Sequence, residues 1–479
     1  MHNCPFHIAT CQGCNGTIED DRLEDEDDTQ SNPSGLSSVP EDLFSRPRSM
    51  TPSSSVSSFH SPEATRMQLK EEFLKLYFPA GISGHDTDFM YSKFLAREAL
   101  DGMGTTMNAA IDALSLAQLG TAHADKRLIR EAQTQYQVAV ANVNADLAQA
   151  NAKQDDGLLG ARYLLGVCQI HSPLSAFRSK ELHLNEHLAA LRELLLARGP
   201  NSQYSRLAQL LLYNFRHVSG IIGHAERKRV ELAGPAWKRC SAITDGIMAS
   251  LSEHLISVPG VLEKADRAMQ RPHRELGELF AVLTELATME RNTQAWLLHW
   301  YSSFDAMPYW QNSVEYYTHF ERSTKGAPAV FSKTLRFPSF SHASAHVTYW
   351  ICLLQIKQTM LEINRLFGPP ILPKSEDTLI AEATECADRL CESLAWITQP
   401  KYGWCGALRS VGPLHYAEKW YASQMDIQKT AWCQKVGASI QKTNNICVHH
   451  KGGQNLHDVG DELDRLLDAD TEDKRYLPC

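Results

Sequence analysis

The sequence has no hydrophobic run long enough to cross a membrane. Its longest apolar stretches, such as residues 210–213 and 349–354, are far shorter than the roughly 20 apolar residues that a spanning helix needs. The first residues, MHNCPFHIATCQGC, also lack the basic and apolar regions of a secretory signal peptide. We therefore expect no membrane association and a location in the cytosol or the nucleus.

Signatures of several large enzyme classes are missing as well. The sequence has no glycine-rich loop for phosphates, no Gly-x-Ser-x-Gly nucleophile elbow and no dinucleotide-binding fingerprint. One short motif, His183-x-x-Glu186-His187, matches the inverted zinc-protease pattern, in which histidines four apart share a helix face. Because short motifs often arise by chance, we expect a packing helix here and not an enzyme. A metal-dependent hydrolase is kept as an alternative.

Other candidate ligands and reactive groups have simpler explanations. His342 and His346 are four apart without an acidic residue between them, which favours core or helix-surface histidines. Ser439-x-x-Lys442 lacks the companion motifs of the lactamases. A loose group in a glycine-containing tail predicts an exposed loop, with metal binding as the lesser alternative: Cys447, His449, His450 and His457.

The composition is that of a globular protein with a mildly acidic balance. The 479 residues carry a net charge of −9, and hydrophobic residues make up 43% of them. That hydrophobic share is sufficient for a real core. The acidic balance argues against a broad nucleic-acid-binding surface, although a small basic module would be compatible with it.

The first 66 residues differ from the rest. They contain four arginines, no lysine and eleven acidic residues, with an acidic block at 19–28 and a Ser/Pro-rich stretch at 31–62. Such a segment cannot bury enough apolar surface to offset the entropy lost on folding, so we predict disorder. Thr51-Pro52 and Ser61-Pro62 are candidate phosphorylation sites. The acidic block is interpreted as a solvated linker, with an activating segment as the weaker alternative.

Cysteine usage divides the chain in the same way. Of the 12 cysteines, three lie at the start and nine are scattered. Without a secretory signal, we predict that the scattered ones are reduced and mostly fill the core. These nine are Cys168, Cys240, Cys352, Cys386, Cys391, Cys405, Cys433, Cys447 and Cys479.

From Met67 onward, apolar residues recur at steps of three and four, which is typical of helices. Alternation with period two is nearly absent, so little sheet is expected. Gly199-Pro200 predicts a helix stop. The predicted helices cover residues 126–150, 182–197, 207–222, 243–256, 275–300, 343–366, 375–397 and 414–436. We therefore predict an all-α fold, a large irregular multi-helix domain at 67–470 with a short tail at 471–479.

Three groups of segments resemble one family when taken in order. The first is MNAAIDALSLAQLGT, YQVAVANVNADLAQ and DDGLLGARYLLGVCQI. The second is HLAALRELLLARGP and SRLAQLLLYNFRHVSGIIGHAERKRVELAGPAW. The third is HASAHVTYWICLLQIKQTMLEINRL, ECADRLCESLAW and GPLHYAEKWY. Residues from about 107 to 440 thus resemble the fungal-specific transcription factor domain, the helical region that follows a zinc-cluster DNA-binding module. A tryptophan that often starts the central helix is absent, and Leu182 and His183 stand there.

The resemblance implies a nuclear regulator of transcription, pathway-specific as in fungal secondary-metabolite gene clusters. Its helical domain would contact other transcription regulators, with a homodimer as a further option. A helical interaction scaffold without a role in transcription is the alternative.

The family's DNA-binding module is absent or degenerate here. That module carries six cysteines around two zinc ions with basic residues between them. Cys11-x2-Cys14 and Cys4 match only part of this pattern, and the basic run is missing. Cys4, His7, Cys11 and Cys14 could together hold one tetrahedral zinc, while a remnant of a lost module (residues 1–18) is the favoured interpretation. Binding to promoter DNA is therefore expected to be indirect, unless an upstream module precedes this chain.

The aromatic stretch at 296–317 admits two interpretations. Large aromatics mainly serve burial, so we predict core packing where helices meet. The alternative is a pocket for a small apolar effector. The residues concerned are Trp296, Trp300, Tyr301, Phe304, Tyr309, Trp310, Tyr316 and Tyr317.

Overall fold

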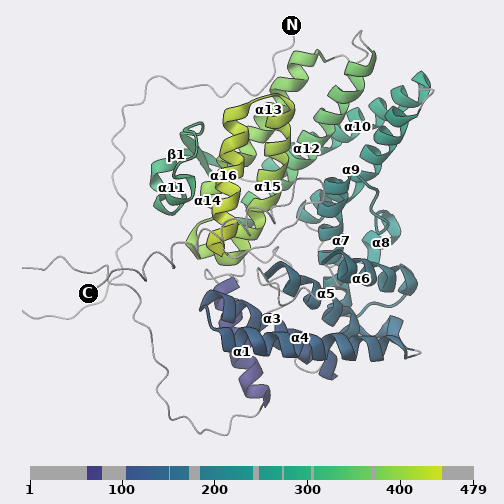
Figure 1. The fold of residues 1–479 in the computed structure, drawn as a ribbon. Coiled ribbons are helices and arrows are strands. Elements are labelled where there is room, and N and C mark those ends of the chain that lie inside the picture. Colours follow the sequence, from purple (N-terminus) through teal and green to yellow (C-terminus); the bar gives the residue numbers. More distant parts are fainter. Residues whose placement is uncertain are drawn as a thin grey trace, which may run out of the picture. The chain divides into compact units, whose positions relative to one another are not determined.

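Helices account for almost all regular structure in the computed structural model (Figure 1). The structure describes residues 62–77, 104–149, 151–171, 184–240, 247–271, 275–303, 307–367 and 374–444. All of them belong to one unit, His60–Cys479. The described part is therefore an all-α fold, as its sequence predicts. No helix in these ranges is long and apolar enough to span a membrane.

The helices fall into two groups along the chain. The first group is α1 (Pro62–Tyr77), α3 (Gly104–Ala122), α4 (Lys126–Leu147), α5 (Asp156–His171), α6 (Leu184–Arg198), α7 (Arg206–Glu226) and α8 (Pro235–Cys240). The second is α9 (Ile247–Gln270), α10 (Leu276–Tyr301), α11 (Thr318–Thr324), α12 (Phe340–Phe367), α13 (Glu376–Glu392), α14 (Leu394–Ile397), α15 (Gly403–Ser423) and α16 (Ile427–Asn444). Single 3₁₀ turns lie between some of them, at Ala152–Gln154, Val314–Tyr316 and Pro400–Tyr402.

The sheet in the described residues is one short antiparallel pair. Strand β1 (Trp310–Ser313) pairs with β2 (Lys333–Arg336), with Trp310 opposite Arg336. The guanidinium of Arg336 also lies over the Trp310 ring, 5.2 Å from its centroid. The sequence predicts little sheet, and the two strands lie in the connection between α10 and α12.

Local signals in the sequence explain where several helices begin and end. Ser205 caps α7 by accepting a hydrogen bond from the Ala208 amide, and Ser375 caps α13 through Thr378 in the same way. After α6, Gly199 has a φ of +78°, a conformation that glycine adopts without strain. The predicted stop at Gly199-Pro200 is therefore confirmed.

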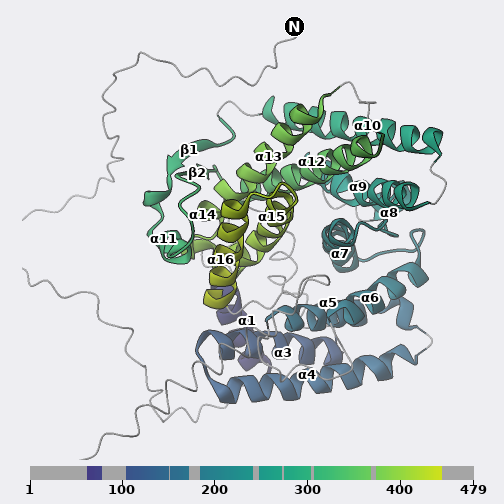
Figure 2. The ribbon, with the colours of Figure 1, turned by 45° about the horizontal axis from the view of Figure 1, so that its top comes forward.

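The helices pack in a continuous series (Figure 2). Helix α3 lies against α4 and α5, and α5 contacts α6 and α7. From α7 the packing continues to α9, then to α10 and α12. Helix α12 contacts α13 and α15, and α15 contacts α16. Helix α1 links the first and last parts of this series, because it packs on both α3 and α15. The Tyr77 ring lies tilted against that of Trp404, with ring centroids 5.3 Å apart.

Helix α12 is the most enclosed element of this arrangement. It contacts α9, α10, α13 and α15, and nearly every side chain from Ser341 to Leu361 is buried or half-buried. A helix that is apolar on all sides has to be covered on all sides. The run at 349–354 noted above as a longest apolar stretch is therefore the middle of a central core helix.

Two expectations about helix boundaries are wrong. Residues 414–436 form no single helix, because α15 ends at Ser423 and α16 begins at Ile427. Met425 takes a left-handed φ of 60°, and the Asp426 carboxylate accepts a hydrogen bond from the Lys429 amide, which starts a new helix. Helix α9 does not end at residue 256 as predicted but continues through Pro259 to Gln270, because its packing on α7, α10 and α12 supports it there.

The predicted N-terminal and C-terminal segments lie mostly outside the described residues. This applies to residues 1–18, most of the linker at 19–66, and the tail at 471–479. Helix α1 begins at Pro62, so the helical region starts a few residues before Met67.

Candidate functional site

The candidate metal ligands near both termini lie outside the described residues. These are Cys4, His7, Cys11 and Cys14, together with the group Cys447, His449, His450 and His457. Within the described ranges, no group of three or more His, Cys, Asp or Glu side chains is close enough to hold a metal ion. The zinc prediction at the N-terminus stays a prediction.

Of the motif His183-x-x-Glu186-His187, only the His187 side chain is described. It is buried on α6, and its Nε2 lies 2.7 Å from the Tyr136 hydroxyl on α4. Burial and the nearby charge of Arg162 lower the pKa of His187 to about 4. A neutral imidazole bonded to a tyrosine ties α6 to α4, which is the packing role that we expected.

His346 is likewise a satisfied core histidine. Its Nδ1 lies 2.7 Å from the His342 carbonyl oxygen, so this nitrogen carries the proton, and its Nε2 accepts from the Tyr301 hydroxyl at 2.8 Å. Burial lowers its pKa to about 3. The imidazole contacts five aromatic rings, those of Trp300, Tyr301, Tyr309, Phe337 and Trp350. Both nitrogens are used, so the ring has no free position for a metal.

The aromatic stretch divides between core and surface. Trp296, Trp300 and Tyr317 are buried, which confirms the core prediction for them. Trp310 and Tyr316 are exposed, and Phe304 lies outside the described residues. The rings of Trp296 and Trp300 stack 5.1 Å apart against α12, so they fill space between helices.

The scattered cysteines are free thiols wherever they are described. Six are buried and Cys240 is half-buried. Burial raises the pKa of the Cys352 and Cys386 thiols to about 12, so both are protonated near neutral pH and are poor nucleophiles. The core-filling prediction is confirmed for this set. On α16, Lys442 of the Ser439-x-x-Lys442 motif is exposed.

Sequence reasoning missed a polar cluster in the interior, centred on Arg409 of α15. Its Nη2 donates to the Ser344 carbonyl oxygen at 2.7 Å and to the Thr348 hydroxyl at 2.5 Å, both on α12. Its Nη1 lies 3.5 Å from Nε2 of His217 on α7. Beyond His217, a chain of longer contacts leads to the Ser252 hydroxyl on α9 and to Tyr213 on α7. We call these six residues the Arg409 cluster.

Four helices surround the Arg409 cluster. Helix α7 packs on α9, α9 on α12 and α12 on α15, and the Tyr416 hydroxyl of α15 donates back to the Ile221 carbonyl oxygen of α7 at 3.4 Å. Gly406 allows α15 to approach the end of α14, because a Cβ there would lie 2.2 Å from the Ile397 carbonyl oxygen. That close approach fixes Arg409, less than one turn further along α15, between the four helices.

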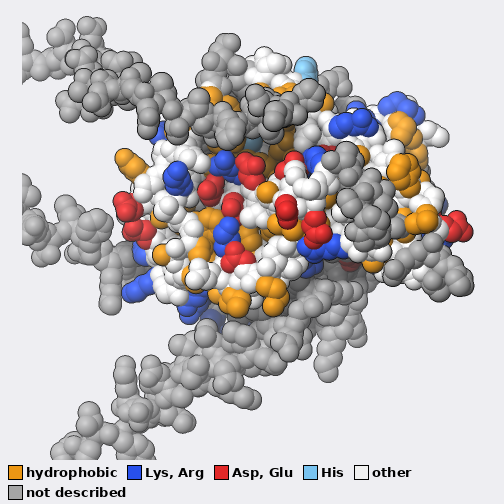
Figure 3. Space-filling model, turned by 90° about the horizontal axis from the view of Figure 1, so that it is seen from above, with side chains coloured by type: hydrophobic (Ala, Val, Ile, Leu, Met, Phe, Trp, Pro, Cys, Tyr) orange, Lys and Arg blue, Asp and Glu red, His pale blue; other side chains and the backbone are white. Residues whose placement is uncertain are grey.

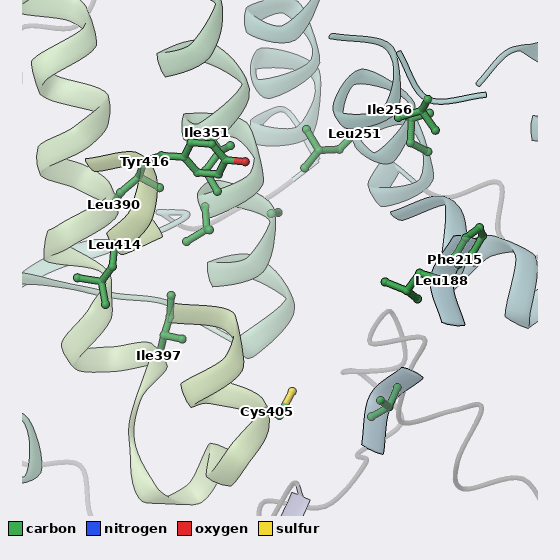
Figure 4. Close-up of a cluster of buried hydrophobic side chains, with 14 of the residues drawn as sticks. Leu188, Phe215, Leu251, Ile256, Ile351, Leu390, Ile397, Cys405, Leu414 and Tyr416 are labelled. Atoms are coloured by element: carbon green, nitrogen blue, oxygen red, sulfur yellow. The ribbon is translucent and has the colours of Figure 1, made fainter. Parts of the chain in front are cut away.

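The helices that carry the Arg409 cluster also carry much of the hydrophobic core. Figure 4 shows Ile351 on α12, Tyr416 on α15, and Leu251 and Ile256 on α9. All four side chains are buried. Cys405, one turn before Arg409, is also buried, and burial raises its pKa, so the thiol stays neutral. The guanidinium is thus a positive charge among apolar and neutral groups.

The charge of Arg409 has no carboxylate partner among the described residues. Burial lowers its pKa to about 10, and Cys405 is the group that opposes this shift. His217 cannot supply a charge either, because burial and Arg409 together lower its pKa to about 3. The Nε of Arg409 and the hydroxyl oxygen of Ser344 are both buried without a hydrogen-bond partner in the described part of the chain.

Other enclosed arginines in the described part of the chain are paired, except Arg162 on α5, which is buried without an ion pair and leaves its Nε without a hydrogen-bond partner. Four of them form short ion pairs with carboxylates: Arg198 with Asp156, Arg216 with Glu253, Arg227 with Asp266, and Arg389 with Glu392. Burying a charge without a partner is strongly unfavourable. The charge of Glu193 raises the pKa of Arg162, whereas no carboxylate does so for Arg409, and Arg409 therefore requires an explanation. No local sequence signal marks it, because its partners come from three helices far apart in the chain.

Comparisons with family models, with curated proteins and with solved structures found no match to this chain.

Proposed function

We propose that this chain regulates transcription through its helical domain, acting on promoters by way of protein partners. The observation that carries the proposal is the placement of the segments that resemble the fungal transcription factor domain. The first group lies on α3, α4 and α5, the second on α6 to α8, and the third on α12 to α15. The helices of the first and third groups pack on one another, and α6 and α7 of the second group both pack on α5 of the first.

The described surface suits protein contacts better than contacts with a phosphate backbone. On the face shown in Figure 3, lysines and arginines alternate with acidic residues, and apolar side chains lie among them. Large exposed apolar residues include Leu276 and Phe280 on α10, Met425 between α15 and α16, and Ile427 at the start of α16. Binding to DNA depends on a concentrated positive surface. The mixture on this face supports contact with another protein. We infer from the resemblance that this partner is a DNA-bound regulator and that the role is pathway-specific, as in secondary-metabolite gene clusters.

The hydrolase alternative receives no support from His187. The His187 ring is buried, its Nε2 is hydrogen-bonded to the Tyr136 hydroxyl, and no group of metal-ligating side chains surrounds it in the described ranges. The scaffold alternative predicts the same helical packing and differs from our proposal in where the protein acts.

The experiment combines localisation with transcript profiling. The full chain is tagged at its own locus, and transcripts are compared between a deletion strain and strains complemented with the wild-type chain or with His187→Gln, whose amide can still accept from Tyr136. We expect nuclear signal, a defined set of changed transcripts, and full restoration by both chains. His254→Gln, at a half-buried histidine outside the motif, is the matched control.

Two outcomes would contradict the proposal. A chain that stays outside the nucleus while its deletion leaves transcripts unchanged would favour the scaffold. If His254→Gln restored the transcripts and an equally abundant His187→Gln did not, the metal-dependent hydrolase would be favoured.

A further inference from the structure

The Arg409 cluster has the composition of a binding site for an anion. A guanidinium has five N–H donors, and Arg409 uses those of Nη2 on Ser344 and Thr348. The Nε hydrogen is unused, and the contact of Nη1 with His217 is long. An unused, charged donor in an apolar interior attracts a negatively charged acceptor more strongly than the same donor would in water.

The position of Arg409 is compatible with access by a small molecule. Arg409 and His217 are half-buried, although the residues that flank them on the same helices, such as Ser410 and Arg216, are almost fully buried. Neither residue is therefore fully enclosed, although the unused Nε of Arg409 is itself buried. The Ser344 hydroxyl, buried and without a partner in the described residues, lies one turn from Thr348 and offers a second polar contact.

The charge of the cluster limits the ligand to a single negative charge. Arg409 contributes one positive charge, whereas His217 stays neutral because its pKa lies near 3. A dianion such as phosphate would leave an uncompensated negative charge in this apolar interior, and a monocarboxylate would leave none. The neutral hydroxyl of Ser344, which has no partner in the described residues, can donate to such a ligand without adding charge.

The rest of the ligand should be apolar. One turn from the cluster along α12 lies Ile351, and Ile256 lies one turn from Ser252 along α9; both are buried aliphatic residues. Small-molecule sites commonly combine such apolar walls with a few polar groups that fix orientation.

We propose that the Arg409 cluster binds a small organic monocarboxylate with an apolar body, whose carboxylate pairs with Arg409. The ligand bridges α15 and α12 to α7 and α9. This binding is independent of the role in transcription proposed above, and it is measured on the purified full chain.

The test compares two probes of the same shape by titration calorimetry near pH 7. Hexanoate carries the carboxylate, and hexanamide replaces it with a neutral amide. Because hydrogen bonds to a charged group are the strong ones, we expect hexanoate to bind at least about tenfold more tightly than hexanamide. Inorganic phosphate, a mixture of monoanion and dianion there that lacks an apolar body, should bind more weakly than hexanoate. Equal affinity for the two hexyl probes, or tighter binding of phosphate, would overturn the proposal.

Two variants locate the binding. Arg409→Met keeps the length of the side chain and removes the charge, and we expect it to reduce hexanoate affinity by at least about tenfold. Arg389→Met is the matched control, because Arg389 is also half-buried but is paired with Glu392 on α13. Unchanged hexanoate affinity in Arg409→Met would refute the assignment. The probe comparison on the wild-type chain decides the question even if a variant does not fold.

Discussion

The ion pair between Arg216 and Glu253 should contribute strongly and asymmetrically to stability. Arg216 on α7 is 2% exposed and forms two hydrogen bonds with Glu253 on α9, at 2.8 and 2.9 Å, while its Nε donates to the Leu232 carbonyl oxygen. Glu253 is 22% exposed, so water can reach it. Glu253→Met leaves the enclosed guanidinium without its carboxylate. Arg216→Met leaves a carboxylate that water can still solvate.

Removing one partner of a buried ion pair lowers the free energy of unfolding by about 3 to 5 kcal/mol. Because Glu253 is partly exposed, we expect the lower end, roughly 3 kcal/mol for Glu253→Met and roughly 1 to 2 kcal/mol for Arg216→Met. The double variant should lose less than Glu253→Met alone, since it removes the unpaired charge. Urea unfolding followed by tryptophan fluorescence measures all three.

An exposed ion pair supplies the control for this experiment. Lys264 and Glu285, 52% and 40% exposed, join α9 to α10 at 2.8 Å. Glu285→Met should change the free energy of unfolding by less than about 1 kcal/mol. The reasoning would be refuted if Glu253→Met were as mild as this control, or if the effects of Arg216→Met and Glu253→Met were additive in the double variant.

Three further predictions follow from burial and close packing. Arg409→Met should leave the melting temperature unchanged or raise it, because it removes an uncompensated charge while the Ser344 carbonyl still accepts from Thr348; a large drop would show that the charge is compensated. The pKa of His346 is near 6.5 in the unfolded chain and about 3 in the folded one, where the ring is buried. Between about pH 6 and pH 4, the unfolded chain therefore binds a proton at this histidine and the folded chain does not. Stability is therefore lost as the pH falls, by about 1.4 kcal/mol per pH unit for each such histidine. His346→Leu should reduce the slope of unfolding free energy against pH by that amount, and an unchanged slope would exclude this cause. Gly406→Ala should lower the free energy of unfolding by about 1 to 3 kcal/mol or more, because the new Cβ would lie 2.2 Å from the Ile397 carbonyl oxygen. A urea unfolding curve identical to that of the wild-type chain would contradict this close packing.

The sequence predicts the fold class well because helical periodicity and capping are local. The apolar positions of α4, including Ala132, Tyr136, Ala139 and Val143, are its buried face. Gly199 predicts a helix end because glycine adopts a positive φ without strain, and this preference depends on a single residue. The break between α15 and α16 was missed because apolar residues continue across it, and the capping role of Asp426 depends on a turn that periodicity does not reveal.

The Arg409 cluster could not be predicted for a different reason. Its members lie on α7, α9, α12 and α15, and Arg409 contacts His217 at a sequence separation of 192 residues. An arginine within a helix usually indicates a solvated face, and the sequence does not say which arginine is enclosed without a carboxylate. The prediction of a core position for His346, in contrast, is confirmed, and His187 is buried as well.

The most direct test of the central claim places the full chain at a promoter. The chain is fused to an unrelated DNA-binding module, and a reporter carrying that module's sites is measured in fungal nuclei. Our account predicts that the tethered chain changes reporter output several-fold, up or down, and that Arg127→Met, at an exposed residue, does the same. A stable, nuclear fusion that leaves the reporter unchanged would contradict the account.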